Sequence, residues 1–246
     1  MISIYLAFIK SASQDPLNRR ATLRAVQPWL CAFQAPSQHE KLAHHPGDAQ
    51  LKYFDDDLEK VILGLKVVNE PGTAYKYASG DTQLLAMVIE KATGKKLYDY
   101  LTESFWKPLG SENSTLWQVD SESHDLVKAY CCIASNAKDF ARFGKLYKDH
   151  GKWNGKQILD SAFIAKSVTP RFAASPEYGY GWWLKNVGDK QFFMMRGHLG
   201  QYVIVEPNDN VIIVRLGHSK GAGDAIATFT DDITTYIDEA YKMLEK

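Results

Sequence analysis

The 246-residue sequence lacks several features that would place it in a specialised class. It has no excess of charge of either sign, since 29 Lys and Arg balance 29 Asp and Glu. It contains no basic stripe, no acidic tail and no apolar run long enough to cross a bilayer. These absences argue against nucleic acid, an anionic membrane surface or a membrane span.

Cysteine is also scarce, with Cys31 and the adjacent pair Cys131-Cys132 as the three examples. This set cannot form a disulfide framework, and neighbouring cysteines rarely satisfy disulfide geometry. The spacing matches no zinc pattern, and the pair His44-His45 stands in a polar loop without a third ligand at a recognisable spacing. We therefore expect buried free thiols, no metal and no other cofactor.

A targeting segment is not visible. The first ten residues, MISIYLAFIK, are apolar but have no charged leading region and no small-residue cleavage site. Residues 1–20 match no pattern and stay unassigned, and the compartment stays open. No internal repeat or low-complexity segment is present.

What the sequence does contain is typical of an ordered globular protein. Six Trp, thirteen Tyr and eleven Phe stand in a chain with 45% hydrophobic residues. A chain of this length can bury a large core.

Helical periodicity dominates residues 21–170. After the turn signal Pro71-Gly72, apolar residues recur at three- and four-residue spacing up to Gly94, which predicts a helix burying one face. Ser79 or Asp81 is expected to cap its start and Gly94 to end it. Ser135 is likewise expected to cap a later helix.

The periodicity changes in residues 171–246. Short β-branched and aromatic runs at 178–185, 191–197, 201–207 and 210–218 are separated by turn residues, and a helical pattern follows in 224–246. We predict an α+β protein, with a helical lobe in 21–170, antiparallel strands in 171–218 and a C-terminal helix.

The stretch from Glu70 to Gly110 carries several motifs in register. In order, these are Pro71-Gly72, Tyr77-Ala78-Ser79, Leu84-Leu85, Glu90-Lys91-Ala92-Thr93-Gly94 and Pro108-Leu109-Gly110. The order resembles the serine β-lactamase and penicillin-binding-protein-like hydrolases, in the branch of class C β-lactamases, esterases and 6-aminohexanoate-dimer-hydrolase-like enzymes. The resemblance extends from about residue 21 to about residue 217.

This resemblance implies a β-lactamase/transpeptidase-like fold in a single domain, and it implies roles for the second motif. Tyr77 would act as a general base, its pKa lowered by neighbouring cations. Ser79 would orient a proton donor. The alternative is that Tyr77 is an aromatic residue of the hydrophobic core without a catalytic role.

The segment Gly197-His198-Leu199-Gly200-Gln201 resembles the third motif of the same family. By that match His198 would flank the substrate carboxylate or the general base, and the Gln201 N–H would bind the oxyanion. Leu199 and Gly200 would contact the substrate. An ordinary histidine at a strand end is the alternative.

The first motif, Ser-x-x-Lys, is the missing part. Its two matches, Ser104 to Lys107 and Ser135 to Lys138, both follow Tyr77, whereas in the family the nucleophile precedes the tyrosine. We therefore expect the N-terminal part of the fold, with the nucleophile, to be missing from this chain.

Two functions remain open. One is a serine hydrolase that cleaves an amide or ester through an acyl-enzyme but is inactive without the Ser-x-x-Lys motif. The other is a non-catalytic homologue that binds a small acyl ligand or a partner protein. An incomplete sheet would also favour self-association, and the resemblance implies relatives that are often exported or periplasmic.

Overall fold

The computed structural model describes residues 33–34, 56–67, 77–222 and 229–245. The chain divides into two compact units, each of which is discontinuous in the sequence. The helical unit comprises Ile2–Pro108 and Thr115–Ala134, and the sheet unit comprises Leu109–Ser114 and Ser135–Lys246. The predictions made for residues 1–20, Cys31, the pair His44-His45 and Pro71-Gly72 lie outside the described residues.

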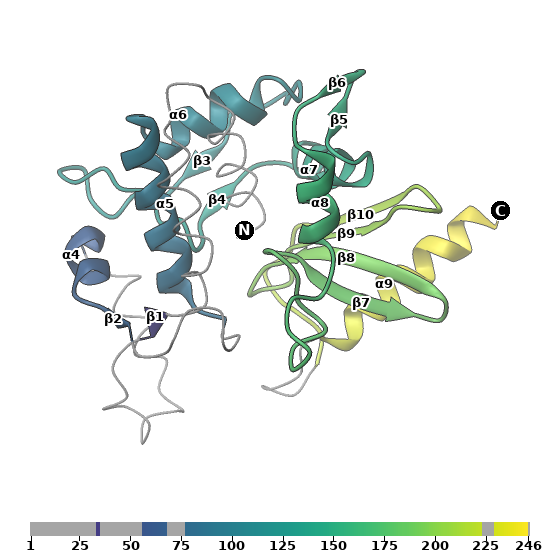
Figure 1. The fold of residues 1–246 in the computed structure, drawn as a ribbon. Coiled ribbons are helices and arrows are strands. Elements are labelled where there is room, and N and C mark those ends of the chain that lie inside the picture. Colours follow the sequence, from purple (N-terminus) through teal and green to yellow (C-terminus); the bar gives the residue numbers. More distant parts are fainter. Residues whose placement is uncertain (1–32, 35–55, 68–76, 223–228, 246) are drawn as a thin grey trace. The chain divides into compact units, whose positions relative to one another are not determined.

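The helical unit consists of short helices and two small sheets (Figure 1). Among its described residues the helices are α4 (Leu58–Leu63), α5 (Ser79–Thr93) and α6 (Leu97–Leu101), and α6 runs into the π-helical segment η3 (Thr102–Trp106). β1 (Phe33–Gln34) pairs with β2 (Lys66–Val67), and β3 (Leu116–Trp117) pairs with β4 (Ile133–Ala134), both antiparallel.

Helix α5 follows the predicted periodicity. Leu85 and Ile89 lie on one face and are 1% and 0% exposed. Gly94 ends the helix with φ +67°, and its N–H donates to the Glu90 carbonyl at 2.8 Å. Glycine adopts this left-handed conformation without a steric penalty, so the predicted helix end is confirmed.

In the part that the structure describes, the sheet unit contains a four-stranded sheet, the two-stranded sheet β5-β6 and three helices (Figure 1). In chain order its elements are α7 (Ala137–Lys148), β5 (Lys152–Trp153), β6 (Lys156–Gln157), α8 (Ser161–Ser167), β7 (Trp183–Val187), β8 (Lys190–Arg196), β9 (Tyr202–Glu206), β10 (Val211–Arg215) and α9 (Asp231–Leu244). The strand order is β10-β9-β8-β7, and all neighbouring pairs are antiparallel. The predicted α+β class is confirmed.

Helices cover both faces of this sheet. Tyr202 and Ile204 of β9 pack with Ile233 and Ile237 of α9. The alternate residues of β9 point to the other face, where a Cβ added to Gly144 of α7 would lie 3.0 Å from Val203. All five residues of β9 are buried as a result. Helices α7 and α8 belong to the same compact unit as the sheet. The predicted boundary at residue 170, between a helical lobe and the strands, stays a prediction.

A buried carboxylate joins the two segments of the sheet unit. The Asp139 side chain, 0% exposed, accepts hydrogen bonds from the backbone N–H groups of Glu112 at 2.9 Å and Asn113 at 3.2 Å. Arg142 donates to the same carboxylate at 2.9 Å. Burial alone would raise the pKa of Asp139, but hydrogen bonds from Glu112, Asn136 and Asn113 hold it below its ordinary value.

The start of α7 corrects one prediction. The N-cap is Asn136, whose side chain accepts a hydrogen bond from the Asp139 N–H at 2.9 Å, and not Ser135. Both residue types can accept this bond, so their order in the sequence could not distinguish them.

None of the described helices is long and apolar enough to cross a membrane.

Candidate active site

The second motif lies at the first turn of α5. Tyr77 precedes the helix and is 50% exposed, and Ser79 is the first helical residue and half-buried. The N-cap is Ala78, in an extended conformation, and the helix has no side-chain cap hydrogen bond. The expectation that Ser79 or Asp81 caps α5 was therefore wrong, because the position before Ser79 is a methyl side chain with no acceptor.

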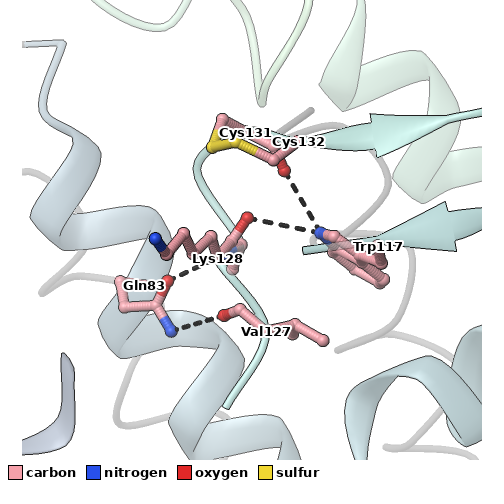
Figure 2. The surroundings of a disulfide bond; sticks show 7 residues. Gln83, Trp117, Val127, Lys128, Cys131 and Cys132 are labelled. Atoms are coloured by element: carbon pink, nitrogen blue, oxygen red, sulfur yellow. Dashed lines mark hydrogen bonds between the residues drawn. A yellow bond between two sulfur atoms is a disulfide. The ribbon is translucent and has the colours of Figure 1, made fainter. Parts of the chain in front are cut away.

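Gln83 anchors this end of α5 to the segment that follows residue 126. Its side chain is 0% exposed. Its Nε2 donates to the Val127 carbonyl at 2.9 Å, and its Oε1 accepts from the Ala129 N–H at 2.8 Å. Gln83 lies one helical turn beyond Ser79, so its hydrogen bonds fix the first turns of α5, which carry Ser79, to residues 127 and 129. Figure 2 shows the Gln83 side chain facing Val127 and Lys128.

The same segment contains a disulfide between Cys131 and Cys132 (Figure 2), so the expectation of free thiols was wrong for this pair. Successive side chains of an extended chain point to opposite sides. Cys132 instead has φ +72°, in the left-handed region, so the chain turns at the pair. Trp117 fastens this turn, because its Nε1 donates to the carbonyls of Cys131 at 3.1 Å and Lys128 at 3.3 Å.

The third motif forms the turn between β8 and β9, residues 197–201. The Gly197 N–H donates to the Gln201 carbonyl at 2.7 Å, which closes the turn. Inside it the Leu199 N–H donates to the Gln201 Oε1 at 3.2 Å. His198 is exposed and Leu199 is 45% exposed at the tip.

Gly200 allows this turn for two reasons. Its φ is +79°, which disfavours residues with a Cβ atom. A Cβ atom at this position would also lie 2.0 Å from Nη1 of Arg215 and 2.3 Å from the Ser219 carbonyl oxygen. The close approach at Gly200 is thus to other residues of the protein, and its contact with the substrate stays a prediction.

The two motifs belong to different units. Tyr77 and Ser79 lie in the helical unit, whereas His198, Leu199, Gly200 and Gln201 lie in the sheet unit. Within each unit the predicted residues are neighbours. Their convergence on one pocket stays a prediction.

The two Ser-x-x-Lys matches occupy structural positions. Ser104 is half-buried in η3 while Lys107 is exposed. The hydroxyl of Ser135 is buried directly before α7, and it has no hydrogen-bond partner in the part of the chain that the structure describes. Among the described residues, no three His, Cys, Asp or Glu side chains are grouped as metal ligands.

The sequence did not reveal Gln83 or Arg215. Gln83 lies within an ordinary helical pattern, and a buried glutamine has no signature of its own. Arg215 ends a strand, and its contact with Gly200 follows from strand register, which a single sequence does not determine.

Comparisons with known proteins add a family assignment. A family model described as Beta-lactamase matches residues 20–233. A 6-aminohexanoate-dimer hydrolase of Paenarthrobacter ureafaciens is 23% identical over 58% of this chain, and the match spans 38% of that protein. A D-aminopeptidase of Brucella anthropi is 30% identical over 28% of this chain and 14% of its own length. The chain thus matches less than half the length of these relatives.

Solved structures show the same fold. A candidate 6-aminohexanoate-dimer hydrolase from Bacillus anthracis superposes with a TM-score of 0.74 at 22% identity, covering 99% of this chain and 70% of that one. An octameric penicillin-binding protein homologue from Pyrococcus abyssi has a TM-score of 0.65 at 15% identity, covering 98% of this chain and 65% of that one. At these sequence identities the structural similarity supports the assignment of the fold alone.

Proposed function

This chain belongs to the beta-lactamase family, and on that premise we propose that it carries the second and third motifs of a serine hydrolase that cleaves an amide or ester through an acyl-enzyme. Tyr77 and Ser79 supply proton transfer, and His198 and the Gln201 N–H supply substrate contact and oxyanion binding. The names of its relatives, a dimer hydrolase and a D-aminopeptidase, favour a small linear amide as substrate.

The observation that carries this proposal is the form of the turn at 197–201. An exposed histidine, His198, lies two residues before Gly200, whose φ is +79°. Among the described residues none accepts a hydrogen bond from the Gln201 N–H that follows. A free backbone donor at a fixed turn is what oxyanion binding requires.

The covalent step needs a group that this sequence does not contain before Tyr77. A serine hydroxyl is a weak nucleophile until an adjacent base accepts its proton, and a lysine one helical turn away serves that purpose in Ser-x-x-Lys. Ser104 and Ser135 follow Tyr77 in the chain, and the lysine of each match, Lys107 and Lys138, is exposed. We propose that this chain does not form an acyl-enzyme at the usual serine.

A fluorophosphonate probe followed by intact mass tests this. We expect no stoichiometric labelling of the wild-type chain. Labelling that disappears in Ser104→Ala or Ser135→Ala would contradict the structural assignment of those serines. Labelling lost only in Ser79→Ala would make Ser79 the nucleophile.

The second candidate is a non-catalytic homologue that binds a small acyl ligand or a partner protein. The encoding DNA discriminates between the two. An in-frame Ser-x-x-Lys upstream of Met1 supports the hydrolase, and a genuine start site without one supports the binding protein.

We also propose self-association through the sheet. Strand β10 is an edge strand of the four-stranded sheet, with no strand beyond it among the described residues. An open edge offers unpaired backbone groups to another chain. Sedimentation velocity over a concentration series should show reversible association, and a monomer at all concentrations would count against it.

A further inference from the structure

We propose that Arg215 is a positioning residue that aims the Gln201 N–H through the peptide bond between Gly200 and Gln201. The inference rests on the proposed function, because it gives that N–H its role as oxyanion donor. It adds a residue outside the predicted motifs, contributed by a strand that does not contain either of them.

Strand register brings Arg215 to the turn. Arg215 is the last residue of β10 and lies opposite Tyr202, the first residue of β9. Tyr202 directly follows the turn at 197–201. The arginine side chain therefore starts beside the turn although it lies 15 residues from Gly200 in the sequence.

Two backbone carbonyls hold the guanidinium. Its Nη1 donates to the Gly200 carbonyl at 2.6 Å and to the Ser219 carbonyl at 2.7 Å. Hydrogen bonds from a charged donor are roughly twice as strong as those between neutral groups. The rigid guanidinium plane fixes the direction of both bonds.

Glycines and aromatic rings shape the space around this group. A Cβ atom on Gly200 would lie 2.0 Å from Nη1, and one on Gly217 would lie 2.6 Å from Cζ. The rings of Tyr202 and Tyr236 lie 5.8 and 5.4 Å from Cζ. The guanidinium therefore has little freedom to turn away from the Gly200 carbonyl.

The peptide plane transmits this constraint. A trans peptide is planar, and its C=O and N–H bonds point in opposite directions. No cis peptide occurs in the described residues. Because Arg215 holds the Gly200 oxygen on one side, it directs the Gln201 N–H to the opposite side, where no described residue accepts it.

The Gln201 side chain gives the turn a second attachment to the same segment. Its Nε2 donates to the Gly217 carbonyl, while its Oε1 accepts from the Leu199 N–H. This amide ties the tip of the turn to residue 217, and Arg215 ties Gly200 to residue 219. The turn is thereby set by the chain that follows β10.

Nuclear magnetic resonance tests the orientation directly. Residual dipolar couplings and order parameters of the Gln201 N–H report its direction and its rigidity in the folded protein. In wild type we expect an order parameter of about 0.85, typical of rigid backbone. In Arg215→Met we expect a value below about 0.6 and a changed coupling, with the amides of Val203 to Val205 unaltered.

Arg196→Met is the matched control, because Arg196 also lies opposite Tyr202, stacks on Trp183 at 4.6 Å and has no hydrogen bond to the turn among the described residues. It removes the same charge at the same end of the sheet and should leave the Gln201 N–H unchanged. Arg215→Lys should restore the order parameter in part, since an ammonium group can donate to the Gly200 carbonyl without the planar fork.

Gly217→Ala provides a second variant if Arg215→Met fails to fold. The added methyl displaces the guanidinium without removing its charge, so the Gln201 N–H should again lose order. Unchanged couplings and order in both Arg215→Met and Gly217→Ala would overturn the inference, as would an equal change in Arg196→Met. Neither readout depends on catalysis, so a chain that never reacts with an acyl probe still tests the role of Arg215.

Discussion

The start of α5 and the turn between β8 and β9 carry the two predicted motifs, yet they are held by different means. The α5 terminus has no side-chain cap hydrogen bond, and Gln83, one turn inside the helix, anchors it to residues 127 and 129. The β8–β9 turn is fastened at Gly200 by Arg215 and internally by the Gln201 side chain. The third motif is therefore shaped within its own sheet, whereas the second depends on the attachment of a whole helix.

The largest effect should come from breaking the helix anchor. Gln83→Met leaves the Val127 carbonyl and the Ala129 N–H buried without partners, which should lower the free energy of unfolding by about 3 kcal/mol. Urea denaturation followed by circular dichroism measures it. Gln157→Met is the control, because that exposed side chain also donates to carbonyls, those of His150 and Leu159, and should cost less than about 1 kcal/mol. Equal costs would contradict the anchoring role.

Gly94 at the end of α5 and Gly200 in the β8–β9 turn allow the backbone strain of the two regions to be compared. Gly94 and Gly200 have φ +67° and +79°, but a Cβ atom on Gly94 meets nothing within 4 Å, whereas one on Gly200 meets Arg215 and the Ser219 carbonyl. Gly94→Ala should cost about 1 kcal/mol from conformation alone, and Gly200→Ala about 2 kcal/mol or more. Equilibrium urea unfolding of both variants decides whether the steric contact adds to the strain.

Two acidic groups, one on α5 and one on α9 beside Tyr202, should respond to pH in opposite directions. Burial raises the pKa of Glu90 on α5. At Asp232, burial would raise the pKa, but Thr230, the Gly221 N–H and Tyr202 with the charge of Arg215 lower it. The Asp232 contribution to stability is thus present above its unfolded pKa of about 3.9 and lost as pH falls through the folded value. The Glu90 contribution is present below about 4.3 and lost as pH rises through its folded value.

Unfolding free energies of Glu90→Gln and Asp232→Asn from pH 3 to 7 test these signs. Glu90→Gln should gain stability relative to wild type as pH rises, because its side chain stays neutral. Asp232→Asn should lose stability relative to wild type over the same range. Parallel curves for the two variants would show that the local environments do not differ in this way.

The smallest effect is expected from the disulfide beside the Gln83 anchor. A bond between adjacent residues closes almost no chain loop, so its reduction should change the free energy of unfolding by less than about 1 kcal/mol. Alkylation of the denatured chain should add one group, at Cys31, without reductant and three groups after reduction. Three groups without reductant would show that Cys131 and Cys132 are not joined.

Periodicity was enough to predict the regular parts of this fold. The β-branched and aromatic run of β9 and the three- and four-residue spacing in α5 identified a strand and a helix. The strand is buried on both faces, and the helix buries one face. Asn154-Gly155, a residue pair that tolerates positive φ, forms the hairpin turn between β5 and β6 with φ +47° and +80°. These features depend on residues close together in the sequence.

The parts that could not be predicted depend on contacts between distant segments. The bond from Arg215 to Gly200 follows from the pairing of β9 with β10, and the bonds of Gln83 follow from the position of residues 127–129 beside α5. Cap choice failed for a different reason, since Ser135 and Asn136 are equally able acceptors. The candidate site residues came from a family resemblance, and the residues that hold them came from the structure.

The Asp139 carboxylate has a consequence for limited proteolysis. Residues 109–114 precede the exposed stretch at Glu122 and Ser123 in the chain, yet they belong to the sheet unit, most of which follows that stretch. A protease that cuts between Glu122 and Ser123 would leave these residues on the N-terminal fragment. Asp139, on the C-terminal fragment, would still hold their N–H groups. The nicked protein should therefore stay together as a two-fragment complex in native buffer and separate only in denaturant.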